Sequence, residues 1–536
     1  MLEIPVLIAG GGPVGLTASL LLSRQGIRSL LVERHSGTAR VPKARGINAR
    51  TMEMYRQLGL EADIRGAGLS AQSTGLIVWT ESLAGREIER RVPGRALAKN
   101  LAMTPTTNCL CAQDDLEPVL RRHAEAVGLG DIRFATEMTA LEPDATGVDV
   151  TIRDLATSAE TAVRARWLIA ADGAQSRVRR MMNVRMIGEE RVYDSVNILF
   201  RADLTEWVKD RPAALYFVEQ PELRGTFLTI NARDRWGFLI HSLSQYGYKP
   251  ADFTPELCTA LVRQAAGLPE LPIEVLGVSA WEASAIVAER YRDGPLLLTG
   301  DAAHEMPPTG GFGMNTGVQD ALNLCWKLSA VQRGEAGEAL LDTYDAERRP
   351  LAELTTRTSL ANALSMGRTA KQDKAVLPRR EFLNEQGLIF GIAYESAAVL
   401  PDGTQPVVPE DPVTEYLPSA RPGGRAPHVW LWRGEERISS IDLLGNGFVL
   451  LTGKEGTPWA EAALALAGID TPLIAVHTIG GNALMDPDDA WATAYGVDAD
   501  GAVLVRPDGY VAWRSQGSSQ DPARLLREVL DSVLQR

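Results

Sequence analysis

Residues 4–36, IPVLIAGGGPVGLTASLLLSRQGIRSLLVERHS, decide the fold of this chain. The run Ile4–Ala9 is continuously apolar, which is typical of a strand buried on both faces of a parallel sheet. After a glycine-rich turn, an apolar segment predicts a helix that ends near Arg24 or Gln25, with Gly26 as its stop. A second strand is predicted over Ser29–Val32. This order predicts the first unit of a doubly wound α/β domain.

The turn carries the pattern G-x-G-x-x-G at Gly10, Gly12 and Gly15. The first glycine permits the sharp turn, the second lets a pyrophosphate approach the backbone, and the third lets the helix pack closely on the strand. Glu33 ends the second strand, where a carboxylate can accept both ribose hydroxyls. Because a carboxylate there disfavours a ribose 2′-phosphate, the predicted ligand is the ADP group of FAD or NAD, not of NADP.

The bulk composition is that of an ordinary globular protein: 45% of its 536 residues are hydrophobic and 23% are charged. That length predicts two to four domains, because one hydrophobic core does not grow so large. The net charge of −13 and the pI near 5.2 argue against a partner that is nucleic acid or an anionic membrane. A local basic cluster is still compatible with an anionic ligand.

Cysteine content and hydropathy indicate a reducing compartment, and we expect the cytoplasm. The chain begins with a predicted strand, without a signal peptide, and no apolar run approaches the roughly 18 residues of a membrane span. The four cysteines are too scattered for a disulfide framework, and no metal site is predicted from them: Cys109, Cys111, Cys258 and Cys325.

A second informative stretch is GDAAHEMPPTGGFGMNTGVQDALNLCWKL at 300–328. Its segment from Pro307 to Met314 is rich in proline and glycine, which excludes a regular helix or a central strand. A buried strand is predicted before it at 295–300, and an amphipathic helix after it from Met314 to Leu328. The alternative to a functional loop is an ordinary connector in front of a core helix.

Four stretches occur in an order that resembles the single-component FAD-dependent aromatic hydroxylases, a family of flavoprotein monooxygenases. They are VPKARGINARTMEMYRQLGL at 41–60, CAQDDLEPVL at 111–120, LIAADGAQSRVR at 168–179 and the stretch at 300–328. The resemblance covers roughly residues 1–370. It implies a Rossmann-like FAD-binding domain, interrupted by a β-sheet substrate domain, that acts on phenols, salicylate-like acids or polycyclic aromatic polyketides.

The resemblance also implies which residues bind FAD. Lys43 stands where the family usually has arginine, and Arg45 follows two places on, so which of the two reaches the flavin stays open. Asp301 is expected to accept hydrogen bonds from the ribityl hydroxyls, and the pair Asp172-Gly173 to serve both FAD and the nicotinamide cofactor. The full expected set is Gly10, Gly12, Pro13, Val14, Gly15, Glu33, Arg34, Lys43, Arg45, Gln113, Asp172, Gly173, Asp301, Gly313, Met314 and Asn315.

In the same family the loop after Asp301 lies beside the isoalloxazine ring. Pro308 and Gly311 are therefore expected at the catalytic centre, where a fixed backbone faces the substrate. His304 is also placed there, although it could equally hold the loop by a hydrogen bond. The amides of Met314 and Asn315, at a helix start, are expected to stabilise the negative charge of reduced flavin.

Further domains are predicted from strand patterns and composition. The FAD-binding domain is assigned to 1–180 and 281–400, including a helical return, and the substrate-binding sheet to 181–280. A proline-rich linker at 401–427 precedes a thioredoxin-like domain at 428–536, which has no cysteine. Candidate substrate contacts in the sheet are Tyr216, Trp236 and His241, although strand alternation places about half of such residues on the wrong face.

The expected reaction uses NADPH or NADH and O2 to hydroxylate a phenolic aromatic, with a polycyclic aromatic polyketide preferred, through a flavin C4a-hydroperoxide. Two alternatives remain open from the motifs. One is a flavin oxygenase that performs Baeyer–Villiger insertion or oxidative ring rearrangement. The other is a flavin-bound protein of low turnover that sequesters a reactive intermediate. A homodimer is compatible with the sequence.

Overall fold

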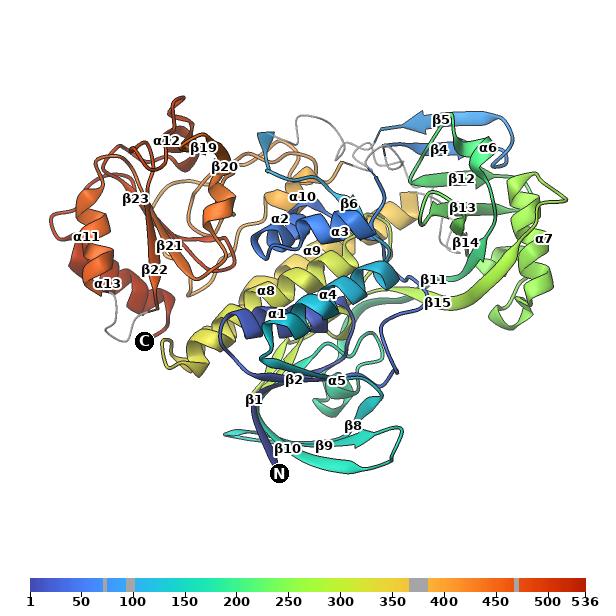
Figure 1. The fold of residues 1–536 in the computed structure, drawn as a ribbon, viewed down its shortest axis with the longest axis horizontal. Helices are drawn as coiled ribbons and strands as arrows, with labels where there is room; N and C mark the ends of the chain where they lie inside the picture. The colour runs from blue at the N-terminus through green and yellow to red at the C-terminus, as the bar shows by residue number, and fades with distance from the viewer. Residues whose placement is uncertain (71–74, 93–101, 366–383, 467–471) are drawn as a thin grey trace.

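The computed structural model describes residues 1–70, 75–92, 102–365, 384–466 and 472–536. Three bodies surround the two long helices α8 (Gly313–Gln332) and α9 (Asp342–Ser365), as Figure 1 shows. A parallel sheet lies below these helices, a large antiparallel sheet lies to the right, and the C-terminal domain lies to the left.

The first body contains the predicted doubly wound unit. Its central strands run in parallel in the order β17-β10-β1-β2-β7, with α1 (Pro13–Arg24) between β1 and β2, so the opening prediction is confirmed. Helices α1, α8 and α4 (Gln113–Val127) pack together on this sheet. The strands are β1 (Leu2–Ala9), β2 (Ser29–Val32), β7 (Gly130–Arg133), β8 (Thr136–Asp144), β9 (Gly147–Asp154), β10 (Glu160–Ala170), β16 (Arg292–Asp293) and β17 (Leu296–Leu298).

The second body is an eight-stranded sheet in the order β18-β15-β11-β14-β13-β12-β4-β5, with α7 (Pro255–Ala266) packed on one face. The sheet extends beyond the predicted substrate-binding range of 181–280. β4 and β5 join it from far earlier in the chain, because β4 pairs in parallel with β12. The strands are β4 (Ile77–Thr80), β5 (Glu87–Arg91), β11 (Met186–Arg201), β12 (Leu215–Glu219), β13 (Arg224–Thr229), β14 (Arg235–His241), β15 (Glu274–Ala288) and β18 (His304–Glu305).

The third body is a four-stranded sheet in the order β22-β21-β23-β24, with a parallel first pair and two antiparallel pairs. This is the thioredoxin-like arrangement that the sequence predicts. Its elements are β19 (Trp430–Arg433), β20 (Glu436–Ser439), β21 (Phe448–Thr452), α11 (Thr457–Leu466), β22 (Ile474–Thr478), α12 (Ala490–Tyr495), β23 (Ala502–Val505), β24 (Val511–Ser515) and α13 (Pro522–Val533).

The expected linker at 401–427 is only partly a linker. Residues 401–423, all of them described, contain no helix or strand, but Gly424 and Arg425 form bridges to Ala393 and Tyr510. Its last residues therefore pack against the C-terminal domain. The FAD-binding range predicted over 281–400 also includes 366–383, which lie outside the described residues.

The remaining short elements connect these bodies. A two-stranded pairing of β3 with β6 brings the stretch at 41–60 beside the stretch at 111–120. Among the described residues, no helix is both long enough and apolar enough to cross a membrane. The short elements are β3 (Gly46–Ile47), α2 (Ala49–Gln57), α3 (Glu61–Ala67), β6 (Cys109–Leu110), α5 (Arg177–Met181), α6 (Thr205–Val208) and α10 (Gln386–Phe390).

Candidate active site

The three motif glycines of the first turn have different structural requirements. Gly10 has a φ of +111°, and a Cβ there would lie 2.2 Å from the carbonyl oxygen of Ala171. A Cβ at Gly15 would lie 2.0 Å from the carbonyl oxygen of Gly10. A Cβ at Gly12, by contrast, would have no described atom within 4 Å. The fold requires the two outer glycines, whereas Gly12 faces open space at the N-terminus of α1, which fits a pyrophosphate.

Glu33 lies at the end of β2 beside this turn. Its Oε2 accepts a hydrogen bond of 2.7 Å from the amide of Gly11, and its Oε1 accepts one of 2.8 Å from the amide of His35. These contacts hold the carboxylate next to the open space at Gly12, as the nucleotide motif predicts. The neighbouring Arg34 is exposed.

The structure separates the two basic residues of the 41–60 stretch. Arg45 donates hydrogen bonds of 2.7 Å to the carbonyl oxygens of Thr229 and Ala214, so its guanidinium fastens this stretch to the antiparallel sheet. Lys43 is exposed, and its charge acts on the carboxyl of Asp301. Of the two, Lys43 is therefore the one available to a ligand beside Asp301.

Asp301 follows β17 in a short 3-10 turn, Gly300–Ala302. The residue is exposed, but desolvation of its carboxyl by the surrounding protein raises its pKa, and the charges of His304 and Lys43 oppose that rise. Helix α8 holds this turn, because the amide of Gly300 donates to Asp320 Oδ2 at 3.2 Å. Arg179 fastens it from the side by donating to the carbonyl oxygen of Ala302 at 2.9 Å.

The proline- and glycine-rich loop leads directly into α8, which begins at Gly313, one residue before the predicted start. Pro308 and Gly311 are exposed, and Gly311 has a φ of +70°. Asn315 holds the loop: its Nδ2 donates to the carbonyl oxygens of Gly311 at 2.7 Å and Gly46 at 2.9 Å. Because Asn315 is 1% exposed and its side chain binds Gly311 and Gly46, this side chain serves the loop.

His304 does not lie at the catalytic centre, so that prediction is wrong. Its ring is fully buried, and its Nε2 lies 2.8 Å from Asp320 Oδ2. The reason is strand pairing: His304 lies in β18 opposite Val287 of β15, and this register turns the ring into the core beneath α8. The alternative reading, a histidine that holds the loop, is the one that the structure supports.

Gln113 and Asp172 both lie at the starts of helices. Gln113 begins α4, and Asp172 precedes α5. Gln113 is the first residue of α4, and its Nε2 donates to Glu117 Oε1 at 2.7 Å. Asp172 follows β10, and its Oδ2 accepts hydrogen bonds from the first amides of α5, at 2.8 Å from Arg177. Gly173, with a φ of +79°, turns the chain between these elements. The roles expected of them toward FAD remain predictions.

Tyr216 and Trp236 lie on the wrong face of the antiparallel sheet, so their prediction as substrate contacts is wrong. Both are 1% exposed and pack in a core with Cys258 and Leu261 of α7. The Tyr216 hydroxyl donates to the carbonyl oxygen of Arg211 at 2.9 Å. Strand alternation decides this outcome, because residues one apart in a strand face opposite sides.

His241 lies on the other face, which is turned toward the FAD-binding domain. At one end of that face Tyr193 packs near Ala363 of α9, and at the other end Leu199 packs on Ala112 before α4. His241 Nδ1 lies 2.9 Å from Ser195 Oγ between these two contacts.

Sequence reasoning missed other residues of this face. Trp281 and Tyr193 both contact the His241 ring edge-on. Asn197 is 9% exposed, and its Oδ1 has no hydrogen-bond partner among the described residues. Their signal was present as a period of two, because Tyr193, Ser195 and Asn197 alternate along β11. One strand alone does not show which of its two faces meets the FAD-binding domain.

The chain matches two family models. Residues 3–359 match the FAD binding domain, and residues 419–536 match the C-terminal domain of aromatic-ring hydroxylases. The chain belongs to the FAD-dependent aromatic-ring hydroxylases. It is therefore a flavoprotein monooxygenase, and the family uses NAD(P)H as the reductant.

Relatives of this hydroxylase extend over its whole length. A putative polyketide hydroxylase from Streptomyces halstedii is 41% identical, covering 99% of this chain and 97% of that protein. Aklavinone-11 hydroxylase, solved with FAD and aklavinone, is 36% identical with a TM-score of 0.91, covering 100% of both chains. The monooxygenase PieE, solved with FAD and substrate, is 35% identical with a TM-score of 0.91, covering 100% of this chain and 99% of that one.

Proposed function

We propose that this hydroxylase oxidises an electron-rich, phenolic ring of a polycyclic aromatic polyketide. The observation that carries the proposal is the full-length similarity to an enzyme solved with FAD and aklavinone. Relatives named as polyketide hydroxylases add to it. A phenolate is the preferred substrate form, because its ionisation raises electron density ortho and para to the oxygen. These names favour hydroxylation over ring rearrangement or the sequestering of an intermediate.

FAD fits the residues that the first body presents. In this proposal Gly12 and the N-terminus of α1 hold the pyrophosphate, and Glu33 accepts the ribose hydroxyls. Asp301 accepts ribityl hydroxyls, with Lys43 providing the positive charge beside it. When bound, FAD supplies the transfer of electrons from NAD(P)H and the activation of O2.

The start of α8 contributes an electrostatic role. The first amides of a helix have no partner within it, so those of Met314 and Asn315 are available to an anionic edge of the cofactor. Pro308 and Gly311 place exposed backbone, with little side-chain bulk, where a flat ring and its substrate would meet. Asn315 fixes this geometry through its buried side chain.

Substrate would lie against the inner face of the antiparallel sheet. Asn197 Oδ1 accepts a substrate hydroxyl, because it is a buried acceptor with no partner among the described residues. His241, held by Ser195, lies one pair of residues further along the same face. Trp281 adds an aromatic surface for a flat polycyclic ligand.

We expect Asn197→Ala to weaken substrate binding without affecting FAD binding. Losing one hydrogen bond of about 1 kcal/mol should raise KM roughly fivefold. Tyr216→Phe is the control, because it removes a hydroxyl from the opposite face of the same sheet. Steady-state kinetics and FAD titration check both variants. Equal KM values for Asn197→Ala and the wild type would remove Asn197 from the substrate site.

Product analysis tests the proposed function directly. The holoenzyme is incubated with a panel of phenolic polyketides, NADPH and ¹⁸O2, and products are analysed by mass spectrometry. One ¹⁸O atom in a new aromatic hydroxyl, with matching NADPH consumption, is the expected result. Label in a ring ester would instead show Baeyer–Villiger insertion, and substrate binding with no turnover would show a sequestering protein.

Three narrower points belong to the same proposal. O2 is the oxidant, since a monooxygenase needs it for the inserted oxygen atom. The cytoplasm is the proposed location, because it supplies NAD(P)H to the reaction. A homodimer is the proposed assembly, and light scattering of the purified protein measures it.

A further inference from the structure

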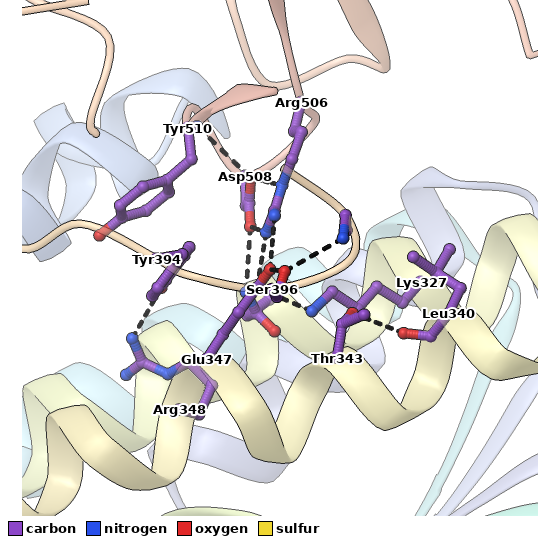
Figure 2. Close-up of polar contacts among 12 residues, drawn as sticks. Lys327, Leu340, Thr343, Glu347, Arg348, Tyr394, Ser396, Arg506, Asp508 and Tyr510 are labelled. Atoms are coloured by element: carbon purple, nitrogen blue, oxygen red, sulfur yellow. Dashed lines mark hydrogen bonds and ion pairs between the residues drawn. The ribbon is translucent and has the colours of Figure 1, made fainter. Parts of the chain in front are cut away.

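The C-terminal domain is joined to the two long helices by a cluster of buried charges, and Figure 2 shows its members Lys327, Glu347, Arg348, Arg506 and Asp508. All six side chains are at most 1% exposed. The cluster holds three carboxylates and three cations, so its charges balance. We call it the interdomain cluster: Asp320 and Lys327 of α8, Glu347 and Arg348 of α9, and Arg506 and Asp508 of the turn between β23 and β24.

Arg506 makes the link across the domain boundary. Its two terminal nitrogens donate to Glu347 Oε1 at 2.6 Å and Oε2 at 2.8 Å, a paired geometry that fixes direction as well as distance. Arg506 also contacts Asp508, which accepts from the indole of Trp326 in α8 at 3.2 Å. Lys327 adds a contact of 2.8 Å to Glu347. The turn of the C-terminal domain is thus held to both helices (Figure 2).

The contacts continue from α9 to the turn Gly300–Ala302 and the start of α8, which together we call the FAD loop. Arg348, the residue after Glu347, donates to Asp320 Oδ1 at 2.7 Å and to the carbonyl oxygen of Thr316, in the first turn of α8, at 3.0 Å. Asp320 in turn accepts from the amide of Gly300, next to Asp301, at 3.2 Å. Both parts of the FAD loop, the turn at 300–302 and the start of α8, are therefore held by Arg348 and Asp320.

A second contact runs parallel to the first. Arg348 also donates to the hydroxyl of Tyr394 at 2.9 Å, and the ring of Tyr394 stacks on Tyr510 with centroids 4.1 Å apart. Tyr510 lies in the same turn as Arg506 and Asp508, so the C-terminal domain is linked to Arg348 indirectly in two ways, through Glu347 and through Tyr394 (Figure 2).

Buried ion pairs are weak evidence for stability, because desolvation of the charges offsets much of their attraction. A packed apolar surface would fasten two domains equally well. A charge network also fixes the direction of each contact, so it can hold the groups that it joins in one defined position. We infer that Arg506 and Asp508 are positioning residues, through which the C-terminal domain sets the geometry of the FAD loop. The inference rests on the proposed contact of Asp301 and the start of α8 with FAD.

The test is the balanced double variant Arg506→Gln/Asp508→Asn, which removes one positive and one negative charge and so leaves no net buried charge. The matched control is Arg514→Gln/Asp402→Asn. That buried pair joins the C-terminal domain to the segment before it, with both side chains 6% exposed, and Arg514 also donates to the carbonyl oxygen of Tyr495. Neither of its members contacts α8 or α9 in the described residues.

Three quantities are measured for each protein: the unfolding temperature of the apoprotein, its dissociation constant for FAD by fluorescence titration, and the flavin midpoint potential. We expect both double variants to lower the unfolding temperature. Only Arg506→Gln/Asp508→Asn should raise the dissociation constant, by at least tenfold, and shift the potential to more negative values. If the variant weakens the binding of reduced FAD more than that of oxidised FAD, the potential falls. Each tenfold difference between the two losses of affinity lowers it by about 30 mV.

Unchanged FAD affinity and potential in Arg506→Gln/Asp508→Asn would overturn the inference, since the cluster would then only fasten the domains. If that variant does not fold, Arg506→Lys decides, because it keeps the charge but removes the paired contact with both oxygens of Glu347. At least a twofold weaker FAD affinity supports the inference, and wild-type affinity overturns it. Asp301→Ala separates the two proposals: if it binds FAD as the wild type does, the placement of FAD is wrong.

Discussion

Gly12→Val is expected to fold as the wild type does and to lose FAD. A side chain at this position meets no described atom within 4 Å, so the protein itself accepts it. The pyrophosphate requires the same space, and a branched side chain there also blocks the first amides of α1. We expect at least a hundredfold weaker binding, equivalent to about 2.8 kcal/mol, and a colourless purified protein.

Fluorescence titration of the apoprotein with FAD measures this effect, and its unfolding temperature shows whether the fold is intact. Gly66→Val is the matched control, because Gly66 also has open space around its Cβ but lies in α3. Gly15→Val is the contrasting variant and should fail to fold, since its Cβ would lie 2.0 Å from a carbonyl oxygen. FAD binding by Gly12→Val at wild-type strength would contradict the placement of the pyrophosphate.

Asp320→Ala is expected to give the largest loss of stability. The carboxylate is fully buried and contacts Arg348, His304 and the amide of Gly300. Removing it leaves the Arg348 cation buried without its carboxylate, which typically costs about 3–5 kcal/mol. The unfolding temperature of the apoprotein should fall by on the order of 10 °C, as measured by calorimetry.

Asp342→Ala is the control for this prediction. Asp342 also pairs with an arginine, at 2.6 Å from Arg292, but its side chain is 73% exposed. Exposed pairs typically contribute about 0–1 kcal/mol, so this variant should unfold close to the wild-type temperature. Equal effects of the two substitutions would show that Arg348 finds another partner when Asp320 is removed.

The pH dependence of stability provides a second readout for Asp320. Burial raises its pKa, but the charges of Arg348 and His304 outweigh burial and hold the pKa below its ordinary value. Its contribution is therefore present above the pKa of an unfolded aspartate, about 3.9, and is lost as the pH falls from there through the lower folded value. Asp320→Ala should remove this part of the acid sensitivity.

Much of the fold and of the cofactor site could be predicted because the signals are local. The turn requires glycine at Gly10 because of its backbone conformation and at Gly15 because of close contact, and these requirements hold wherever the turn occurs. The strand before Asp301 and the helix after Gly313 follow from runs of apolar residues in the same way. Such patterns depend on neighbours along the chain, and the structure reproduced the type of each element, with ends that differ by up to four residues.

The substrate side of the site could not be predicted in this way. Tyr216 and Trp236 are residue types that often contact ligands, but their positions in the strands place them on the core face of the sheet. One strand alone does not show which of its faces meets the FAD-binding domain. His304 has the same difficulty, since only the pairing of β18 with β15 turns its ring inward. In each case a residue's direction depends on a partner strand that is distant in sequence.

The amino-acid sequence by itself determined the nucleotide turn, the FAD loop and the thioredoxin-like C-terminal domain. Each of them depends on backbone conformation and periodicity within short segments. Only the tertiary structure decided that β4 and β5 join the substrate sheet, and that Asn197 and not Tyr216 faces the FAD-binding domain. It also decided that Arg506 reaches Glu347, 159 residues away. The physical reason is that strand pairing and buried ion pairing join groups by distance in space, which no local pattern records.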